Sequence, residues 1–199
     1  WYPLGMAGTG SADYELIEVF VPEHRTAEVV RTNPRRGGAL FRLGMPGYVV
    51  NEHGSFANAL ARAAIAMMTE TAVAKKRGYA AARSIADREI LQRELSRSTQ
   101  RVNACRALMR DVVERLYDEA EREGQVSPAT QAEARAAATW CTDESIDIIT
   151  ILFRYAGGGA VMEGDRMQDL LRDALTVQSH LVVSDIAYEE HGRLLLGLD

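Results

Sequence analysis

Apolar side chains recur every three or four residues through most of the chain after residue 55, which is the spacing of helices with one buried face. The first predicted helix runs from about Ser55 to the basic segment KKRG, where Gly78 would end it. Its expected apolar stripe consists of Phe56, Leu60, Ala63, Met67, Thr71 and Ala74. A second helix is expected from about Asp87 to Glu123, just before Gly124. Its stripe, which keeps a heptad spacing, consists of Leu91, Leu95, Ser98, Val102, Cys105, Met109, Val112 and Leu116.

Two more helices are indicated by the residues that would start them. Ser127 followed by Pro128 is a favourable helix start, and this helix would end at the glycine run 157–159. Its stripe consists of Ala134, Ala138, Cys141, Ser145, Ile148 and Leu152. Asp165, with Gln168 three residues later, resembles a capping box that opens a fourth helix. The stripe of that helix consists of Leu171, Leu175, Gln178 and Val182, and the C-terminal YEEHGRLLLGLD predicts a short final turn or helix.

Residues 1–36 are rich in glycine and proline and differ from the rest of the chain. Tyr14 to Val21 carries strand-forming residues between GTGS and Pro22, and a second short strand would lie at Leu40 to Arg42. One or two strands do not make a stable sheet, so their partners are absent from the chain or supplied by its helical part. We therefore expect a mainly α protein: an antiparallel four-helix bundle over residues 37–199, preceded by the remnant of a β domain.

The composition narrows the class of protein. The 199 residues, of which 47% are hydrophobic and 26% charged, fit one globular domain and part of a second. With 23 basic and 28 acidic residues the formal charge is -5, so nucleic acid is not an expected partner. No apolar stretch reaches the roughly 18–20 residues that span a bilayer, so no membrane association is expected. Two unclustered cysteines favour a reducing, cytoplasmic setting.

The spacing of histidines and cysteines does not indicate a metal centre. His24, His53 and His191 share no register with one another or with a carboxylate at metal-ligand spacing. Cys105 and Cys141 fall inside predicted helices, away from the helix starts at which a thiolate would be stabilised. We therefore assign no metal site and expect both cysteines to be small buried apolar residues.

The opening sequence W-x-x-x-G-M-x-G-T-G-S-x-D, followed by V-F-V-P-E, resembles the end of the middle β domain in the acyl-CoA dehydrogenase superfamily. The helix count, lengths and order after it are similar to the C-terminal domain of that superfamily. Further along, Y-A-G-G-G resembles its flavin-contacting turn, and Arg172-Asp173 resembles the Arg-Asp pair on its last long helix, whereas Arg166 is displaced from the family position. The resemblance covers nearly the whole chain and corresponds to the C-terminal half of such a protein.

The residues after Asp173 favour one branch of the superfamily. The dehydrogenases usually continue into an E-G-T turn, whereas this chain reads R-D-A-L-T-V-Q-S-H and finishes with G-R-L-L-L-G. That combination resembles the flavin-dependent monooxygenases, which include two-component hydroxylases of phenols and related aromatics. The resemblance implies reduced FMN or FAD delivered by a separate flavin reductase, and hydroxylation of an aromatic or other small organic substrate through a C4a-hydroperoxyflavin.

His180, seven residues after Asp173, is the expected catalytic residue. Helical periodicity would place it off the apolar stripe, on one face with Asp173, Thr176, Val177 and Ser184. The resemblance implies that this face borders the flavin ring, where an imidazole donor would stabilise the flavin peroxide. A lone histidine on a helix is otherwise more often a surface residue or a satisfied interior one.

Two pairs of small residues are candidates for cofactor binding. Thr9 and Ser11 in GTGS would offer hydroxyl and backbone N–H groups to the flavin edge, or would simply form a tight turn. Gly157 and Gly158 would let the backbone approach a phosphate, or would end a helix. The local sequence leaves both alternatives open for each pair.

Three arginines complete the set of cofactor-binding candidates. Arg83 falls near the position of a family arginine that pairs with the flavin phosphate, or is a solvated helix flank. Arg154 is an equally reasonable ligand for an anion. Arg172 and Asp173 would form either a flavin-site pair or, as we favour, an ordinary ion pair within the bundle.

Two alternatives stand beside a monooxygenase. A true acyl-CoA dehydrogenase would need a carboxylate base, for which Glu70 and Glu163 are the candidates. A non-catalytic helical oligomerisation fragment would use the bundle only for assembly. The resemblance also implies a homo-oligomer, expected to be a tetramer, in which the flavin lies between the bundle, the β domain and a neighbouring subunit.

Overall fold

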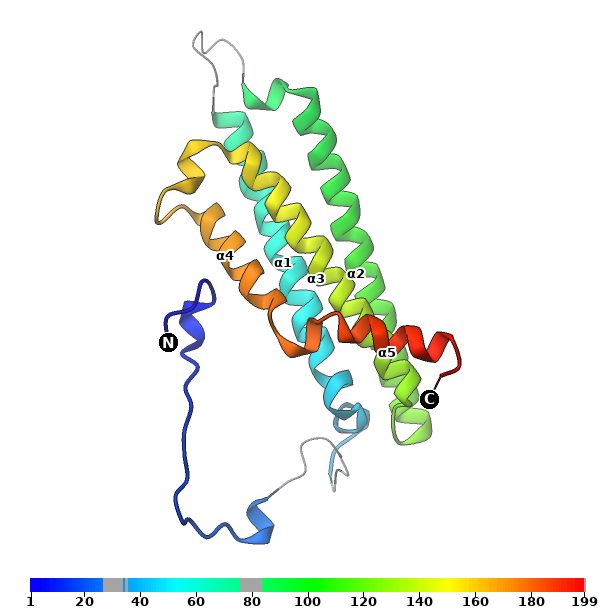
Figure 1. Ribbon diagram of the computed structural model, residues 1–199. Helices are drawn as coiled ribbons and strands as arrows, with labels where there is room; N and C mark the ends of the chain where they lie inside the picture. Colours follow the sequence, from blue (N-terminus) through cyan, green and yellow to red (C-terminus); the bar gives the residue numbers. More distant parts are fainter. Residues whose placement is uncertain (27–33, 35, 76–83, 199) are drawn as a thin grey trace.

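The computed structural model describes residues 1–26, 34, 36–75 and 84–198. Five α-helices occur in these residues: α1 (Gly44–Ala74), α2 (Glu89–Glu123), α3 (Pro128–Ala156), α4 (Arg166–Gln178) and α5 (Ile186–Leu195). Helices α1 to α4 run alternately up and down the bundle, and α5 crosses its side near the start of α3 (Figure 1). The mainly helical antiparallel bundle expected from the sequence is confirmed.

α3 is the central helix, because it packs against α1, α2, α4 and α5. It begins as predicted at Ser127 and Pro128, and Ser127 Oγ accepts a hydrogen bond from Thr130 N at 3.3 Å. It ends at Gly157, whose φ of 81° lies in the left-handed region. The predicted stripe is fully confirmed as buried: Ala134, Ala138, Cys141, Ser145, Ile148 and Leu152.

α2 also follows its prediction closely. A short 3-10 helix, Ile85–Asp87, precedes its start at Glu89, and Gly124, with a φ of 78°, ends it. The buried residues of the predicted stripe are Leu91, Ser98, Val102, Cys105, Met109, Val112 and Leu116, while Leu95 is partly buried. The heptad spacing identified the helix and its buried face correctly because large apolar side chains occupy most of that face.

α1 departs from its prediction in its start and in its buried face. It begins at Gly44, eleven residues before Ser55, and Gly78 lies outside the described residues. Its buried apolar stripe is displaced by one residue and consists of Val50, Gly54, Ala57, Ala61, Ala64, Met68 and Ala72. A Cβ on Gly54 would lie 3.3 Å from Ala138 Cα, so α1 and α3 pack closely there. The predicted stripe was displaced because it was based on the larger apolar side chains, and these lie beside the buried stripe of mostly small residues.

α4 is shorter than predicted. Asp165 caps its start as expected and accepts a hydrogen bond from Met167 N at 2.9 Å, whereas Gln168 donates to the preceding turn at 3.0 Å instead of completing a capping box. The helix ends at Gln178, and a 3-10 helix, Leu181–Val183, follows it. The buried residues of α4 are Met167, Ala174 and Val177. Of the predicted stripe, Leu171 and Val182 are partly buried against the core, whereas Leu175 and Gln178 are exposed. As in α1, the prediction was based on the larger leucines and missed a small buried residue beside them, Ala174.

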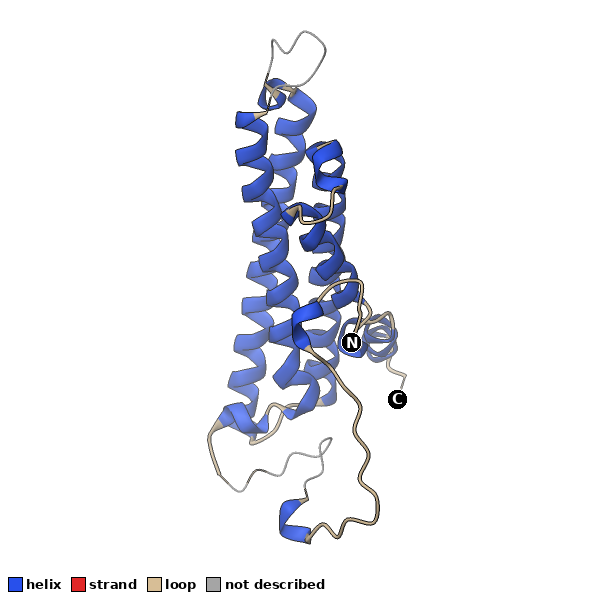
Figure 2. Ribbon diagram, turned by 90° about the vertical axis from the view of Figure 1, so that its left-hand side faces the viewer, coloured by secondary structure: helices blue, strands red, loops and turns tan. Residues whose placement is uncertain are grey.

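Neither of the two predicted strands forms in this chain. Tyr14 to Val21 carries no strand, and Leu40 to Arg42 belongs to the 3-10 helix Ala39–Arg42. A strand is held by backbone hydrogen bonds to a neighbour, and the part of the chain that the structure describes supplies none to this segment. Figures 1 and 2 show the N-terminal segment running away from the bundle as an extended loop. The division into a β remnant and a bundle stays a prediction.

The hydrophobic core runs along the bundle as two clusters. One lies where α4 covers the bundle and includes Met68, Leu91 and Leu152. The other lies toward the start of α3 and includes both Cys105 and Cys141, which are fully buried as predicted. Among the described helices, none combines the length and the apolar character that crossing a membrane requires.

Candidate active site

The first residues of the chain are clamped to α4 by the Arg172-Asp173 pair. Arg172 Nε donates to Leu4 O, and Met6 N donates to Asp173 Oδ1, each at 2.6 Å. Between these two contacts, a Cβ on Gly5 would lie only 2.2 Å from Arg172 O, so the close approach requires glycine. Both residues thus bind backbone groups of the N-terminal segment, which is a different contact from the ion pair within the bundle that the sequence favoured. A role of Arg172 in flavin binding stays a prediction.

The clamped segment closes one side of a pocket of about 530 Å³, whose other sides are α1 and the end of α4. The predicted residues Thr9, Ser11 and His180 all line it. Its full lining consists of Trp1, Met6, Thr9, Ser11, Glu52, His53, Phe56, Thr176, Val177, Ser179 and His180. The walls are therefore largely apolar, while hydroxyl and imidazole groups supply hydrogen-bond donors and acceptors. Candidates from opposite ends of the sequence meet in one place.

The sequence predicted His180 on the fourth helix. It lies just beyond the end of α4, where it opens the 3-10 helix Leu181–Val183. Its Nδ1 accepts a hydrogen bond from Val182 N at 3.2 Å. Because the accepting nitrogen carries no proton, the neutral ring has its proton on Nε2. Arg135 of α3 fixes the same turn by donating to the carbonyls of Leu181 and Val182 at 2.7 and 3.0 Å. The backbone contacts thus place the turn that carries the imidazole, and the bond from Val182 N favours the Nε2–H tautomer.

His53 is the main pocket residue that sequence reasoning missed. It lies on α1, and its ring centroid is 4.1 Å from that of His180, with the ring planes 30° apart. Burial and the neighbouring His180 lower the pKa of His53, while Glu52 opposes the shift, so the neutral ring is favoured at pH 7. In the sequence, His53 stands out only as a possible metal ligand, and its spacing does not favour that role. A contact between α1 and the end of α4 leaves no periodic signal that could have found it.

The remaining cofactor candidates do not line this pocket. Gly157 and Gly158 form the turn after α3, and Arg154 is exposed on the last turn of that helix. Arg83 lies outside the described residues. The structure therefore brings together Thr9, Ser11 and His180 and leaves the glycine turn and Arg154 at the other end of α4.

A second cavity, of about 370 Å³, lies beside the glycine turn. Lys75 and Arg166 line it, and Lys75 Nζ donates to Ala156 O at 3.0 Å, which ties the end of α1 to the end of α3. Asp165 also lines this cavity, so its lining carries two cations and one carboxylate, whereas Glu52 is the carboxylate that lines the His180 pocket.

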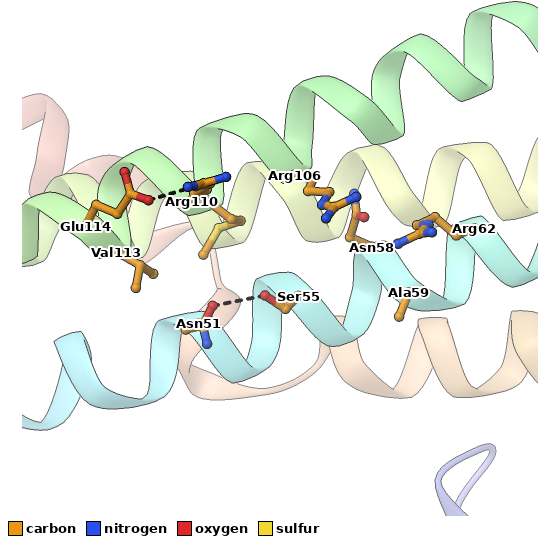
Figure 3. A pocket seen from close by; sticks show the side chains of 10 residues that line it. Asn51, Ser55, Asn58, Ala59, Arg62, Arg106, Arg110, Val113 and Glu114 are labelled. Atoms are coloured by element: carbon orange, nitrogen blue, oxygen red, sulfur yellow. Dashed lines mark hydrogen bonds and ion pairs between the residues drawn. The ribbon is translucent and has the colours of Figure 1, made fainter. Parts of the chain in front are cut away.

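A third cavity, of about 390 Å³, lies in the groove between α1 and α2 (Figure 3). Three arginines line it: Arg62, Arg106 and Arg110. None of the predicted site residues lines this groove. Glu70 and Glu163, the carboxylates considered for a dehydrogenase, are exposed and line none of the three cavities. Within the described ranges, no group of three or more His, Cys, Asp and Glu residues is arranged to hold a metal ion.

Comparison with known sequences defines the class of protein. Residues 53–185 match the family model described as acyl-CoA dehydrogenase, C-terminal domain. The match covers more than half of the chain, and the helical bundle agrees with it. The chain belongs to this family.

Individual relatives then place the chain within the family. A pigment production hydroxylase from Rhodococcus sp. (strain ATCC 21145) is 28% identical over 214 aligned residues, which cover 100% of this chain and 52% of that protein. Two solved structures are each 22% identical and cover 100% of this chain and 52% of theirs: XiaF from Streptomyces sp. in complex with FADH2 and glycerol (TM-score 0.84), and the HsaA monooxygenase from M. tuberculosis (TM-score 0.86). These structures share the fold. The chain spans about half the length of these relatives.

Proposed function

We propose that the chain forms the C-terminal half of a flavin-dependent monooxygenase that hydroxylates an aromatic or other small organic substrate. The observation that carries the proposal is the pocket in which Thr9, Ser11 and His180 meet. The relation to a pigment production hydroxylase and the shared fold with HsaA and with the FADH2 complex of XiaF support it. Reduced FMN or FAD would be the cofactor.

The residues of the pocket fit a reduced flavin ring. Trp1 and Phe56 offer flat apolar surface for the ring, and the hydroxyls of Thr9 and Ser11 offer partners for its polar edge. When bound, reduced flavin supplies the electron pair with which one oxygen atom of dioxygen is reduced to water while the other enters the substrate. Trp1 and Phe56 are exposed in this chain, so exclusion of water from that reaction would require further protein surface over the pocket.

His180 would act as a fixed hydrogen-bond donor in this pocket. Its Nδ1 is occupied by Val182 N–H, so the neutral ring offers Nε2–H to its surroundings. A donor that is already oriented stabilises negative charge that develops on oxygen. His180 is exposed in this chain, so the full effect would require a ligand or further protein to cover the pocket. The turn held by Arg135 keeps the imidazole in place before any ligand arrives.

The second cavity would serve the phosphate end of a flavin. Lys75 and Arg166 line it, and Gly157, Gly158 and Arg154 lie near the same end of α3. Since these groups are separate from the His180 pocket, we propose that they bind the flavin of a neighbouring copy. This arrangement requires a homo-oligomer, for which we propose a tetramer in the cytoplasm, supplied by a separate flavin reductase.

A dehydrogenase remains the second candidate because one carboxylate does line the pocket. Glu52 lies next to His53 on α1, whereas Glu70 and Glu163 lie outside. Removal of an α proton from a thioester needs such a base. Glu52→Gln would abolish thioester-dependent reduction of bound FAD if this candidate were correct, and would leave the reaction of reduced flavin with oxygen unchanged under the monooxygenase proposal.

The test is an anaerobic titration of the chain with reduced FMN and with reduced FAD, followed by mixing with oxygen. We expect binding of reduced flavin and slower reoxidation of the bound flavin than of the free one, with His180→Asn accelerating reoxidation roughly ten-fold or more. His24→Asn, on the exposed 3-10 helix Glu23–Arg25, is the matched control. Tight binding of oxidised FAD with thioester-dependent reduction would favour the dehydrogenase. If the chain binds neither reduced flavin nor oxidised FAD, the non-catalytic oligomerisation fragment becomes the favoured alternative.

A further inference from the structure

The pocket contains two imidazole rings, and only one of them has a place in the proposed reaction. His53 stacks on His180 with 4.1 Å between ring centroids. It comes from α1, which is anchored in the core on both sides of this point by the fully buried Val50 and Ala57. The ring of His53 therefore rests on a rigid helix, whereas His180 lies in a short turn after the end of α4.

The hydrogen bond to Val182 N alone does not restrain the His180 ring fully. A single acceptor contact at 3.2 Å permits the ring to tilt about that bond. The His53 ring, with its centroid 4.1 Å away, limits this freedom, because tilting toward it would drive the two rings into each other. The two contacts together, one in the ring plane and one on its face, define the orientation of the imidazole.

We propose that His53 is a positioning residue for His180, which holds the ring of His180 in the orientation and the tautomer that leave Nε2–H as the donor in the pocket. The proposal rests on the proposed function for its catalytic meaning. The contact between the two imidazole rings does not involve flavin, so it can be tested in the flavin-free chain.

Charge adds a second reason for the pairing. Among the residues that line the pocket, the titratable side chains are Glu52, His53 and His180. A charged His180 at this distance repels a second positive charge, so it disfavours the protonated form of His53. The lowered pKa of His53 agrees with this arrangement, with burial as the first cause and His180 as the second. A neutral pair preserves the accepting Nδ1 on which the tautomer of His180 depends.

The experiment is 15N NMR of the histidine rings in the 199-residue chain, without flavin. The chain has 4 histidines, so single variants assign each ring. In the wild type we expect widely separated nitrogen signals for His180, as the Nε2–H tautomer requires. His53→Ala should draw the two signals together, because the released ring exchanges between tautomers. His53→Phe keeps a flat stacking partner and should retain the separated signals.

The reciprocal variant tests the contact from the other side. His180→Asn removes a nearby imidazole, so the pKa of His53 should rise toward its usual value of 6.5. His24→Asn is the control variant, and thermal unfolding of every variant checks that the fold is kept. A variant His53→Ala that retains the separated His180 signals would overturn the proposal, as would a pKa of His53 that does not move in His180→Asn.

These outcomes are separable from those of the flavin titration. If the ring signals behave as expected and reduced flavin does not bind, the histidine pair stands and the proposed function fails. If flavin binds and His53→Ala leaves the His180 signals unchanged, the function stands and the positioning role fails. If both hold, His53→Ala and not His53→Phe should accelerate reoxidation of bound reduced flavin, by less than His180→Asn does.

Discussion

The seam between α2 and α3 and the His180 pocket are built in opposite ways. The seam joins two consecutive long helices through side chains that repeat at heptad spacing, and each such residue is buried against its neighbour. The pocket joins the N-terminal segment, α1 and the end of α4, and its contacts are single hydrogen bonds and one ring pair. Many side-chain contacts hold the seam together, whereas the pocket depends on a few. Substitutions in the two regions should therefore differ in the size and in the reach of their effects.

The largest effect is expected from a cavity in the seam. Leu116 is fully buried on α2, so Leu116→Ala should reduce the free energy of unfolding by about 2–5 kcal/mol. Leu175 is 38% exposed on α4, and Leu175→Ala is the matched control, for which we expect a loss of less than about 1 kcal/mol. Urea unfolding followed by circular dichroism measures both. Equal losses in the two variants would contradict a core in which Leu116 is a central residue and Leu175 a peripheral one.

An intermediate and purely local effect is expected at the clamp. Gly5→Ala places a Cβ 2.2 Å from Arg172 O, so the segment should detach and lose the contacts of Leu4 and Met6. Local opening should become easier by roughly 1–3 kcal/mol, while the global unfolding midpoint stays within error. Trp1 fluorescence in a Trp140→Phe background and limited proteolysis report the opening. Gly8→Ala, where no atom lies within 4 Å of the new Cβ, should behave like the parent, and matching behaviour of both variants would exclude the clamp.

The smallest effect is expected from the pH dependence of stability. The folded state lowers the pKa of His53 from 6.5, so below that pH the unfolded chain binds a proton that the folded chain does not. This contribution destabilises the protein as the pH falls through 6.5 toward the folded-state pKa, and it vanishes above that window. His53→Phe should therefore lose less stability between about pH 7 and pH 5 than the parent does. Urea unfolding across this range measures the slope, and parallel curves would refute it.

Periodicity predicted the parts of the fold that large side chains control. Leu91 to Leu116 on α2 and the Ser127 start of α3 followed directly from spacing and capping. On α1 the buried face is built from alanines and Gly54, whose small size allows close packing and also hides the face from a pattern weighted by large residues. Strand propensity at Tyr14 to Val21 could not produce a strand, because a partner must supply the hydrogen bonds.

The site was predictable only as separate pieces. The resemblance picked out Thr9, Ser11 and His180 one at a time, and the structure places all three around one pocket. It could not reveal His53, because a stacking contact between two distant segments follows from the tertiary fold and not from local spacing. The position of His180 beyond the helix end was missed for a related reason: the end of α4 is set by the turn that Arg135 holds from α3.

The hydrogen bond between Met6 and Asp173 closes a loop of nearly the whole chain. Loops of that length are entropically costly to close and form late during folding, whereas contacts between consecutive helices form early. Refolding should therefore pass through a stage in which circular dichroism has recovered and the pocket does not yet exist. On refolding, the chain would become helical first and able to bind a ligand only afterwards, when the segment Leu4–Met6 reaches α4.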